Sequence, residues 1–174
     1  RGDLILHWDD DDWYSPGRIT YQVHGHKMGQ PPDVSGFTCA LFVDAAEGKA
    51  WRRNSFLIGA TLCYRKTFWR THHFLDLNIG EDIAFWKSAS VITQLNDPRF
   101  FVCRIHDANI ITQRPTGIMM AGPFTPVNPY AVRRIVGCDW DRYFGGEQGL
   151  PIGAQRSTVS AERSAVFSFT SHGI

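Results

Sequence analysis

The sequence predicts an α/β fold with a mixed sheet flanked by helices, and three observations lead to this prediction. The apolar run from Leu4 to Trp8 lacks the alternation of a half-exposed strand, which indicates a strand covered on both faces. Ser15 and Pro16 then form a helix start, because the hydroxyl can accept from free N–H groups and proline fits the first turn. Further strand and helix patterns follow one another along the chain as far as residue 136.

The remaining elements are predicted from alternation, aromatic content and turn residues. In the first helix, Ile19 and Val23 share one face. Residues 37–44 form a strand, Gly48 turns the chain, and residues 50–53 return as the second strand of a hairpin. The other predicted elements are a strand at 60–65, helices at 66–71, 81–90 and 129–136, and an antiparallel pair of strands at 91–96 and 100–105.

Composition is typical of one globular domain, since the 174 residues are 43% hydrophobic and 20% charged. The net charge of +1 argues against a general nucleic-acid surface. No apolar run approaches the roughly 20 residues of a membrane span and no signal peptide is visible, so we expect a cytoplasmic protein without a transmembrane segment. Peripheral association with a membrane stays open. The cysteines are widely spaced and are predicted to be reduced core residues: Cys39, Cys63, Cys103 and Cys138.

An acidic run, Asp9 to Asp12, follows the first strand directly. Like charges about 5 Å apart repel by roughly 3 kcal/mol at an effective dielectric near 20, and a structural turn usually needs only one Asp or Asn. A hard divalent cation such as Mg²⁺ or Mn²⁺ removes this objection. A solvated acidic loop is the other interpretation. The loop must lie beyond the carboxyl end of a strand, where ligands bind in open α/β sheets, and this position favours the metal site.

The stretch from residue 2 to residue 16, which holds this run and Pro16, resembles the Asp-X-Asp-Asp-X-X-X-Pro segment of family 2 glycosyltransferases. Later segments agree with that family in the same order: an acceptor-side strand and helix at 59–69, a Glu-Asp motif at 80–86 and a His-X-X-Asn motif at 106–109. The resemblance covers about residues 1–117. It implies the GT-A fold and an inverting sugar transfer that depends on a metal and a nucleotide-sugar.

The resemblance also implies a role for each motif residue. Asp11 would coordinate Mn²⁺ or Mg²⁺, Asp9 would be its companion, and His106 would be a further ligand through a neutral ring nitrogen. Asp82 would be the base that deprotonates the acceptor hydroxyl, and Glu81 would bind or orient the acceptor. Further substrate-binding positions are Asp12, Trp13, Trp86, Arg104 and Asn109.

Each of these features has a structural interpretation as well. His106 could be a hydrogen-bonded histidine at a strand end. Glu81 and Asp82 are acidic residues in a first helical turn, where the helix dipole favours them in any case. Large aromatic side chains are buried by default. His24 and His26 lie where the first helix ends, and we expect surface histidines there rather than a metal pair.

A family 2 enzyme normally begins with a nucleotide-binding half, and the motifs of that half do not occur in this chain. We therefore expect residues 1–117 to form the metal-binding and acceptor side of a transferase domain, residues 118–144 to form a helical extension, and residues 145–174 to form a tail or linker. The first strand would then lack parallel neighbours and expose an edge. Such a chain by itself would turn over little.

The expected partners are a nucleotide-sugar donor, in the first place a UDP-sugar, and a saccharide, lipid or protein acceptor. Two other classes of function stay open. One is a non-catalytic carbohydrate- or metal-binding fragment, or a degenerate transferase. The other is a metal-dependent hydrolase that uses Asp9, Asp11 and Asp82. A glycosidase needs two carboxyls and neither nucleotide nor metal, so dependence on UDP and Mn²⁺ separates it from a transferase.

Overall fold

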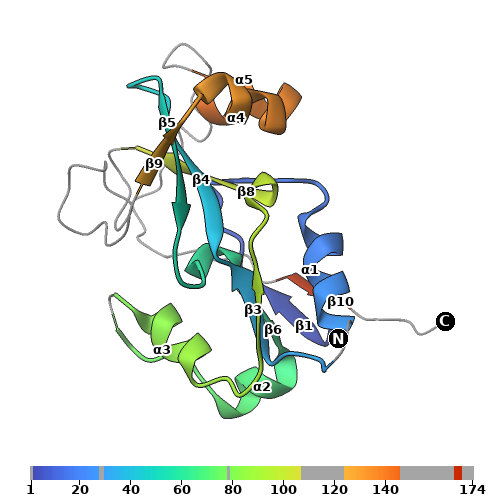
Figure 1. The fold of residues 1–174 in the computed structure, drawn as a ribbon. Helices are drawn as coiled ribbons and strands as arrows, with labels where there is room; N and C mark the ends of the chain where they lie inside the picture. Colours follow the sequence, from blue (N-terminus) through green and yellow to red (C-terminus); the bar gives the residue numbers. More distant parts are fainter. Residues whose placement is uncertain (1, 28–29, 78, 107–123, 146–166, 170–174) are drawn as a thin grey trace, which may run out of the picture.

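Two five-stranded sheets form the frame of the protein in a computed structural model that describes residues 2–27, 30–77, 79–106, 124–145 and 167–169 (Figure 1). The first sheet contains, in spatial order, β10 (Phe167–Phe169), β1 (Leu4–Leu6), β6 (Cys63–Arg65), β3 (Val34–Phe37) and β7 (Ile92–Leu95). The second contains β2 (Trp13–Tyr14), β8 (Phe101–Ile105), β4 (Cys39–Asp44), β5 (Lys49–Asn54) and β9 (Phe124–Val127). Both sheets are mixed, because β3 and β7 pair in parallel, as do β4 and β8. The predicted α/β class is confirmed, with two sheets in place of one.

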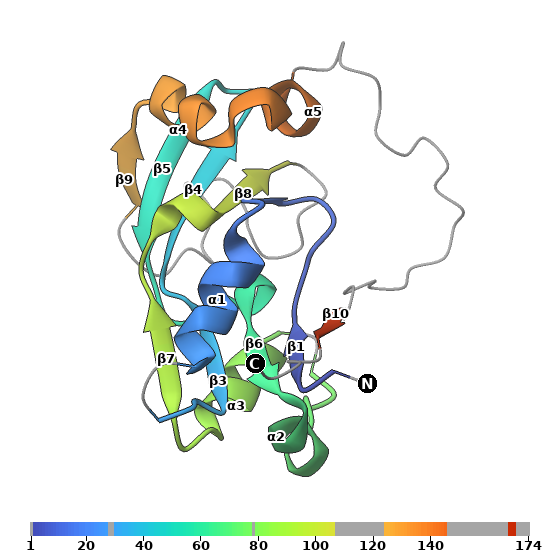
Figure 2. The same ribbon diagram turned by 90° about the vertical axis from the view of Figure 1, so that its right-hand side faces the viewer.

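Helices cover the first sheet and both ends of the molecule (Figures 1 and 2). The α-helices of the described residues are α1 (Arg18–Lys27), α2 (Lys66–Thr71), α3 (Glu81–Lys87), α4 (Pro129–Val136) and α5 (Trp140–Phe144), and the 3₁₀ turns are η1 (Gly59–Thr61), η2 (Pro98–Phe100) and η3 (Gly137–Asp139). Helix α1 packs on β3 and β7. Helices α2 and α3 lie at one end of the molecule, and α4 and α5 lie at the other.

Two segments run from the first sheet into the second. Only Thr38 separates β3 from β4, and the η2 turn separates β7 from β8. Because β3 pairs with β7 and β4 with β8, the two segments lie side by side. The predicted antiparallel pair at 91–96 and 100–105 is therefore wrong. The Asp97 side chain accepts from the Arg99 N–H at 3.0 Å and caps the η2 turn, which carries the chain onward into the second sheet.

Strand β1 has a neighbour on each side. It pairs antiparallel with β6, where Ile5 lies opposite Tyr64, and antiparallel with β10, where Ile5 lies opposite Ser168. Strand β1 therefore lacks parallel neighbours, as expected, but the predicted exposed edge is not found, because β10 pairs with it. The prediction of a tail or linker at 145–174 also missed β10. Its residues form a three-residue strand in a stretch rich in Gly, Ser and Thr, which is too short to display a period of two.

Helix α1 buries a polar stripe. Arg18, Gln22 and His26 follow one another at intervals of four residues and are buried, whereas Ile19 and Val23 are half-buried. Residues four apart lie on one face of a helix, so the stripe is continuous. The apolar face that the sequence singled out is not the side on which α1 meets the core.

The polar side chains of this stripe form hydrogen bonds with residues outside α1. The Gln22 amide donates to the carbonyl oxygen of Thr61 at 2.8 Å. The Nε2 atom of His26 lies 2.8 Å from the Ser35 hydroxyl, and burial lowers the pKa of this histidine to about 4. The prediction of a surface position is thus wrong for His26, and it is confirmed for the exposed His24.

The buried apolar side chains form three clusters, and each has a defined place. The first packs α4 and α5 on the second sheet, with Trp13, Val132 and Phe144 among its members. The second packs α2 and α3 on the first sheet around Phe85. The third includes Phe42 of β4 and other side chains of the second sheet, and half-buried side chains after β1 (Trp8) and at η1 (Ile58 and Ala60) pack against it. The end of β1 is therefore held where the second and third clusters approach each other.

Three of the four predicted core cysteines are buried, and Cys138 is exposed, so the core prediction is wrong for Cys138. All four are free thiols. Within the described part of the chain, none of the helices combines the length and the apolar character needed to cross a membrane.

Candidate metal and catalytic site

Three of the four aspartates in the acidic run converge on one place. After β1 the chain turns at residues 10–12 and returns as β2. Carboxylate oxygens of Asp9, Asp11 and Asp12 all lie within 4.8 Å of one another, whereas Asp10 is exposed and lies outside this cluster. The three carboxylates are called the aspartate cluster below.

The end of β8 supplies two further contacts to the aspartate cluster. Strand β2 pairs antiparallel with β8, which brings the acidic loop alongside residues 104–106. The backbone N–H of Arg104 donates to a carboxylate oxygen of Asp12 at 2.9 Å. The Nε2 atom of His106 lies 3.0 Å from a carboxylate oxygen of Asp11. The structure therefore brings together all the predicted metal ligands, which come from sequence positions almost a hundred residues apart.

Asp12 is the most deeply buried member of the cluster, with 6% of its surface exposed. Burial raises the pKa of its carboxyl to about 8, the N–H of Arg104 opposes this rise, and the nearby Asp11 and Asp9 add to it. Three carboxylates at this spacing are mutually repulsive, so a bound cation would favour the ionised form of each. The donor set of carboxylate oxygens with an adjacent imidazole fits Mn²⁺ or Mg²⁺.

Tyr14 fixes the start of the acidic loop. Its hydroxyl oxygen accepts the backbone N–H of Asp9 at 3.0 Å, and the hydroxyl donates to the carbonyl oxygen of Ala60 at 3.2 Å. The ring is buried and packs on Trp8, with 4.2 Å between ring centroids. Tyr14 therefore ties the acidic loop to the η1 turn.

A fully buried arginine lies behind this tyrosine. The guanidinium carbon of Arg18 is 4.4 Å from the centroid of the Tyr14 ring and 5.0 Å from that of Trp8, a cation–π arrangement. Its Nε donates to Gln22 at 2.8 Å, and its Nη1 has no hydrogen-bond partner among the described residues. No role in the site was predicted from the sequence for Tyr14. The available signal was that Trp8 and Tyr14 flank the acidic run and that a cation follows one helical turn later.

The predicted base, Asp82, lies against the backbone of η1. A Cβ atom at Gly59 would be 3.0 Å from the Asp82 Cγ and would collide with its Oδ2. The other oxygen of Asp82 accepts the N–H of Ile83 at 2.8 Å. Burial raises the pKa of Asp82 and the nearby Glu81 raises it further, while the N–H of Ile83 opposes the rise. A carboxylate with a raised pKa is a better proton acceptor than a solvated one.

The η1 turn links Asp82 to the aspartate cluster. Gly59 contacts Asp82 through its Cα side, and its carbonyl oxygen lies 3.1 Å from the Nδ1 of His7, which follows β1. The next carbonyl, that of Ala60, accepts from Tyr14, which in turn holds Asp9. The candidate base and the start of the acidic loop are thus both attached to a single three-residue turn.

The other predicted site residues are less closely associated. One side-chain oxygen of Glu81 and the Trp86 indole nitrogen are buried and have no hydrogen-bond partner among the described residues. Arg104 contacts Asp12 through its backbone. Trp13 is 3% exposed and donates its indole N–H to Asp139 at 3.1 Å, so its ring packs in the core and offers no face to a ligand, in contrast to the prediction. The predicted substrate-binding residue Asn109 lies outside the described residues.

The site therefore combines a cluster of oxygen donors, an imidazole beside it and a separate half-buried carboxylate that lies against η1. Comparison of the chain with protein-family models, with curated proteins and with solved structures gave no match.

Proposed function

We propose that this chain provides the metal-binding and acceptor side of an inverting glycosyltransferase with a GT-A-like fold, similar to the family 2 enzymes. The transfer would move a sugar from a nucleotide-diphosphate donor, in the first place a UDP-sugar, to an acceptor hydroxyl. One observation carries the proposal: the loop of the aspartate cluster and the half-buried Asp82 are both attached to the same turn, Gly59–Thr61, the loop through the hydrogen bonds of Tyr14 and Asp82 by its contact with Gly59.

The aspartate cluster is the part of the site that suits a diphosphate. Asp9, Asp11 and Asp12 would hold Mn²⁺ or Mg²⁺, with His106 either as a further ligand or as the partner that orients Asp11. When bound, such a cation stabilises the negative charge that grows on a departing diphosphate. The protein itself contributes a fixed loop, because Tyr14 and the N–H of Arg104 hold two of the three aspartates by hydrogen bonds.

Asp82 is the part of the site that suits the acceptor. In an inverting transfer the acceptor oxygen forms a bond to the anomeric carbon while the bond from that carbon to the diphosphate breaks. The proton of the acceptor hydroxyl must leave, and Asp82 would take it on its carboxylate. Glu81 favours this step because its negative charge raises the proton affinity of its neighbour.

Calorimetric titration of UDP with and without Mn²⁺ tests the metal half of the proposal. We expect UDP to bind only when Mn²⁺ is present and Asp11 is intact, so that Asp11→Asn abolishes the heat of binding. Asp10→Asn is the matched control, because it removes the same charge from the same run at an exposed position outside the cluster. Equal loss in both variants would show that the run acts only through its net charge, and would contradict a specific metal site.

Asp82→Asn tests the catalytic half. We expect this variant to bind UDP and Mn²⁺ as the wild type does and to lose the low transfer that the chain supports, since a general base usually contributes roughly 10²- to 10⁴-fold. Unchanged transfer would contradict the assignment of the base. Mn²⁺-dependent cleavage of a glycoside without any nucleotide would instead support a hydrolase.

A further inference from the structure

A surface of exposed apolar side chains lies at the end of the molecule that carries α2 and α3. Its residues are 38% to 57% exposed, which is unusual for large apolar side chains: Trp69, Leu75, Leu77, Ile79 and Ile83. They are called the apolar surface below. Phe56, which is 73% exposed, stacks on Trp86 of α3 and extends it.

In the loop between α2 and α3, an inward-facing aromatic residue packs on the core and fixes the outward position of the apolar residues that follow it. Phe74 turns inward and stacks on Phe85 with 4.0 Å between centroids, and it also stacks on His7 at 5.3 Å. The next residue, Leu75, faces out, and its carbonyl oxygen accepts the N–H of Leu77 at 2.9 Å. The exposure of Leu75 and Leu77 therefore belongs to a defined backbone conformation at residues 74–77, with the half-buried Phe74 packed against the core.

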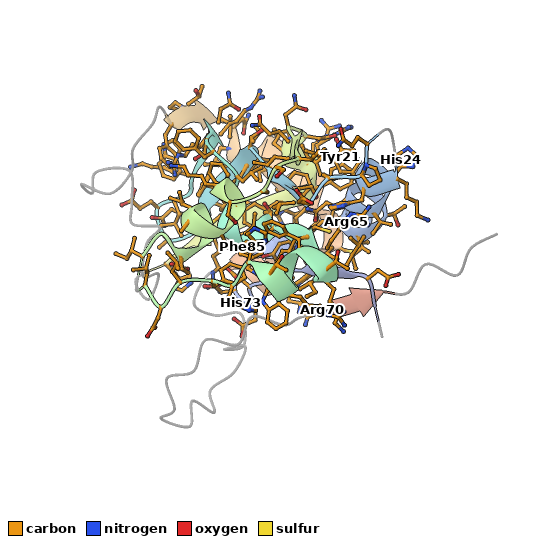
Figure 3. The ribbon with its side chains drawn as sticks, turned by 90° about the horizontal axis from the view of Figure 1, so that it is seen from below. Tyr21, His24, Arg65, Arg70, His73 and Phe85 are labelled. Carbon is orange, nitrogen blue, oxygen red and sulfur yellow. The ribbon has the colours of Figure 1, made fainter. Side chains whose placement is uncertain are left out.

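Cations accompany the apolar surface. From residue 64 to residue 75 the chain contains Arg65, Lys66 and Arg70 and no acidic residue. The acidic residues near the apolar surface are Asp76 in the loop and the half-buried Glu81 and Asp82 at the start of α3. Figure 3 looks onto this end of the molecule and shows Arg65, Arg70 and His73 around α2, with Phe85 between α2 and α3. A tryptophan and exposed aliphatic side chains beside lysine and arginine are the combination that binds the interface of an anionic bilayer.

We propose that the apolar surface docks this chain on an anionic lipid bilayer and that the acceptor is a membrane-borne amphiphile with a free hydroxyl. The second part rests on the proposed function. Ile83 belongs to the apolar surface, and its N–H donates to the carboxylate of Asp82. The base thus lies beside the residues that enter the lipid interface, and a hydroxyl at headgroup depth would meet Asp82 without leaving the bilayer.

Co-sedimentation of the full chain with vesicles tests the docking. We expect binding to phosphatidylcholine vesicles that contain about a third phosphatidylglycerol, weaker binding to pure phosphatidylcholine, and further weakening as salt is raised. Leu75→Ser combined with Leu77→Ser should reduce the partition coefficient about ten-fold or more. Tyr130→Ser is the matched control, because Tyr130 is 75% exposed on α4 at the opposite end of the molecule. No binding, or equal binding by the double variant, would overturn the docking surface.

Charge reversal supplies a second, independent variant. Arg70→Glu should weaken binding to anionic vesicles and leave the weak binding to neutral vesicles unchanged, whereas Arg134→Glu on α4 should have no effect. Sedimentation equilibrium without lipid tests whether a second copy of the chain, and not a bilayer, covers the apolar surface. Self-association that the Leu75→Ser, Leu77→Ser variant abolishes would mean that another copy covers the surface, and this would overturn the membrane proposal.

The proposal of a lipid acceptor can be disproved independently of the proposed transferase function. Vesicle binding uses neither donor nor metal, so it persists if the chain is not a transferase. If UDP and Mn²⁺ bind and transfer occurs, we expect a hydroxyl lipid in vesicles to be a better acceptor than its soluble headgroup, with the advantage lost in the Leu75→Ser, Leu77→Ser variant. Equal transfer to the soluble headgroup would overturn the lipid acceptor and leave the transferase intact.

Discussion

The carboxylate of Asp82 rests on the Cα of Gly59, and no Cβ atom can fit between them. This contact joins the first turn of α3 to the turn that precedes β6. Glycine at position 59 allows this close approach, because an added Cβ would force the Asp82 side chain to shift; no positive φ occurs there. The contact fixes the candidate base relative to Ala60 and, through Tyr14, relative to the loop that carries the aspartate cluster.

Gly59→Ala should therefore displace Asp82 and leave the aspartate cluster in place. The added methyl group would push the Asp82 carboxylate aside, and we expect transfer to fall by at least ten-fold with UDP and Mn²⁺ affinity unchanged. Activity assays and calorimetry on the same preparation measure both quantities. Gly25→Ala is the control, because a Cβ at Gly25 in α1 meets only Leu95 at 3.6 Å, an ordinary contact. A fully active Gly59→Ala variant would show that the Asp82 position is not needed for transfer.

Tyr14→Phe should loosen the aspartate loop. The change leaves the ring in place and removes the hydroxyl that accepts from Asp9 and donates to Ala60. Since these partners are half-buried, we expect a loss of about 1 to 3 kcal/mol in the free energy of unfolding, together with weaker Mn²⁺ binding. Urea unfolding and calorimetry measure the two effects. The same change at the exposed Tyr130 should alter neither, and an equal effect at both tyrosines would contradict the role given to Tyr14.

Much of the candidate metal site could be predicted from sequence because its determinants are local. Like charges in a row are costly without a cation, and the strand before the run and the helix start after it place the loop at a sheet end. His106 was added only through the resemblance, and the structure then places it 3.0 Å from Asp11. The supporting contacts of Tyr14 and Arg18 depend on η1, which is about forty residues away, and no local pattern reports such a distance.

The errors in the fold have a common cause. The turn at Asp97 and Pro98 looks the same in sequence whether the chain reverses or continues, and only the parallel neighbours β3 and β4 decide that it continues. Likewise the periodicity of α1 predicts burial of Ile19, but buried polar partners on other elements draw in Gln22 and His26 instead. In both cases a contact distant in sequence overrides the local preference.

His26 should make stability depend on pH. Its folded pKa is about 4, against 6.5 for the unfolded chain, because burial disfavours the charged ring. Between pH 6.5 and 4 the unfolded state therefore binds more protons at this position than the folded state. The contribution of His26 to the free energy of unfolding is full above pH 6.5 and falls as the pH drops from 6.5 towards 4, with a slope of at most about 1.4 kcal/mol per pH unit. Urea unfolding at several pH values should show a shallower slope for His26→Gln. His24→Gln, at an exposed site on the same helix, should keep the wild-type slope, and a common slope in all three proteins would contradict the prediction.

Asp12→Asn should uncouple stability from metal binding. The asparagine oxygen can still accept the N–H of Arg104, so the loop keeps its tie to β8, but the cluster loses one of three charges. For the wild type we expect Mn²⁺ at about a hundred times its dissociation constant to raise the free energy of unfolding by roughly 2.7 kcal/mol, and a chelator should reverse the gain. The variant should be as stable as the wild type without metal, because it has no buried carboxylate to ionise, and should gain little from Mn²⁺. Asp10→Asn should respond to Mn²⁺ as the wild type does. A full Mn²⁺ response in Asp12→Asn would mean that the cation binds without the buried member of the cluster.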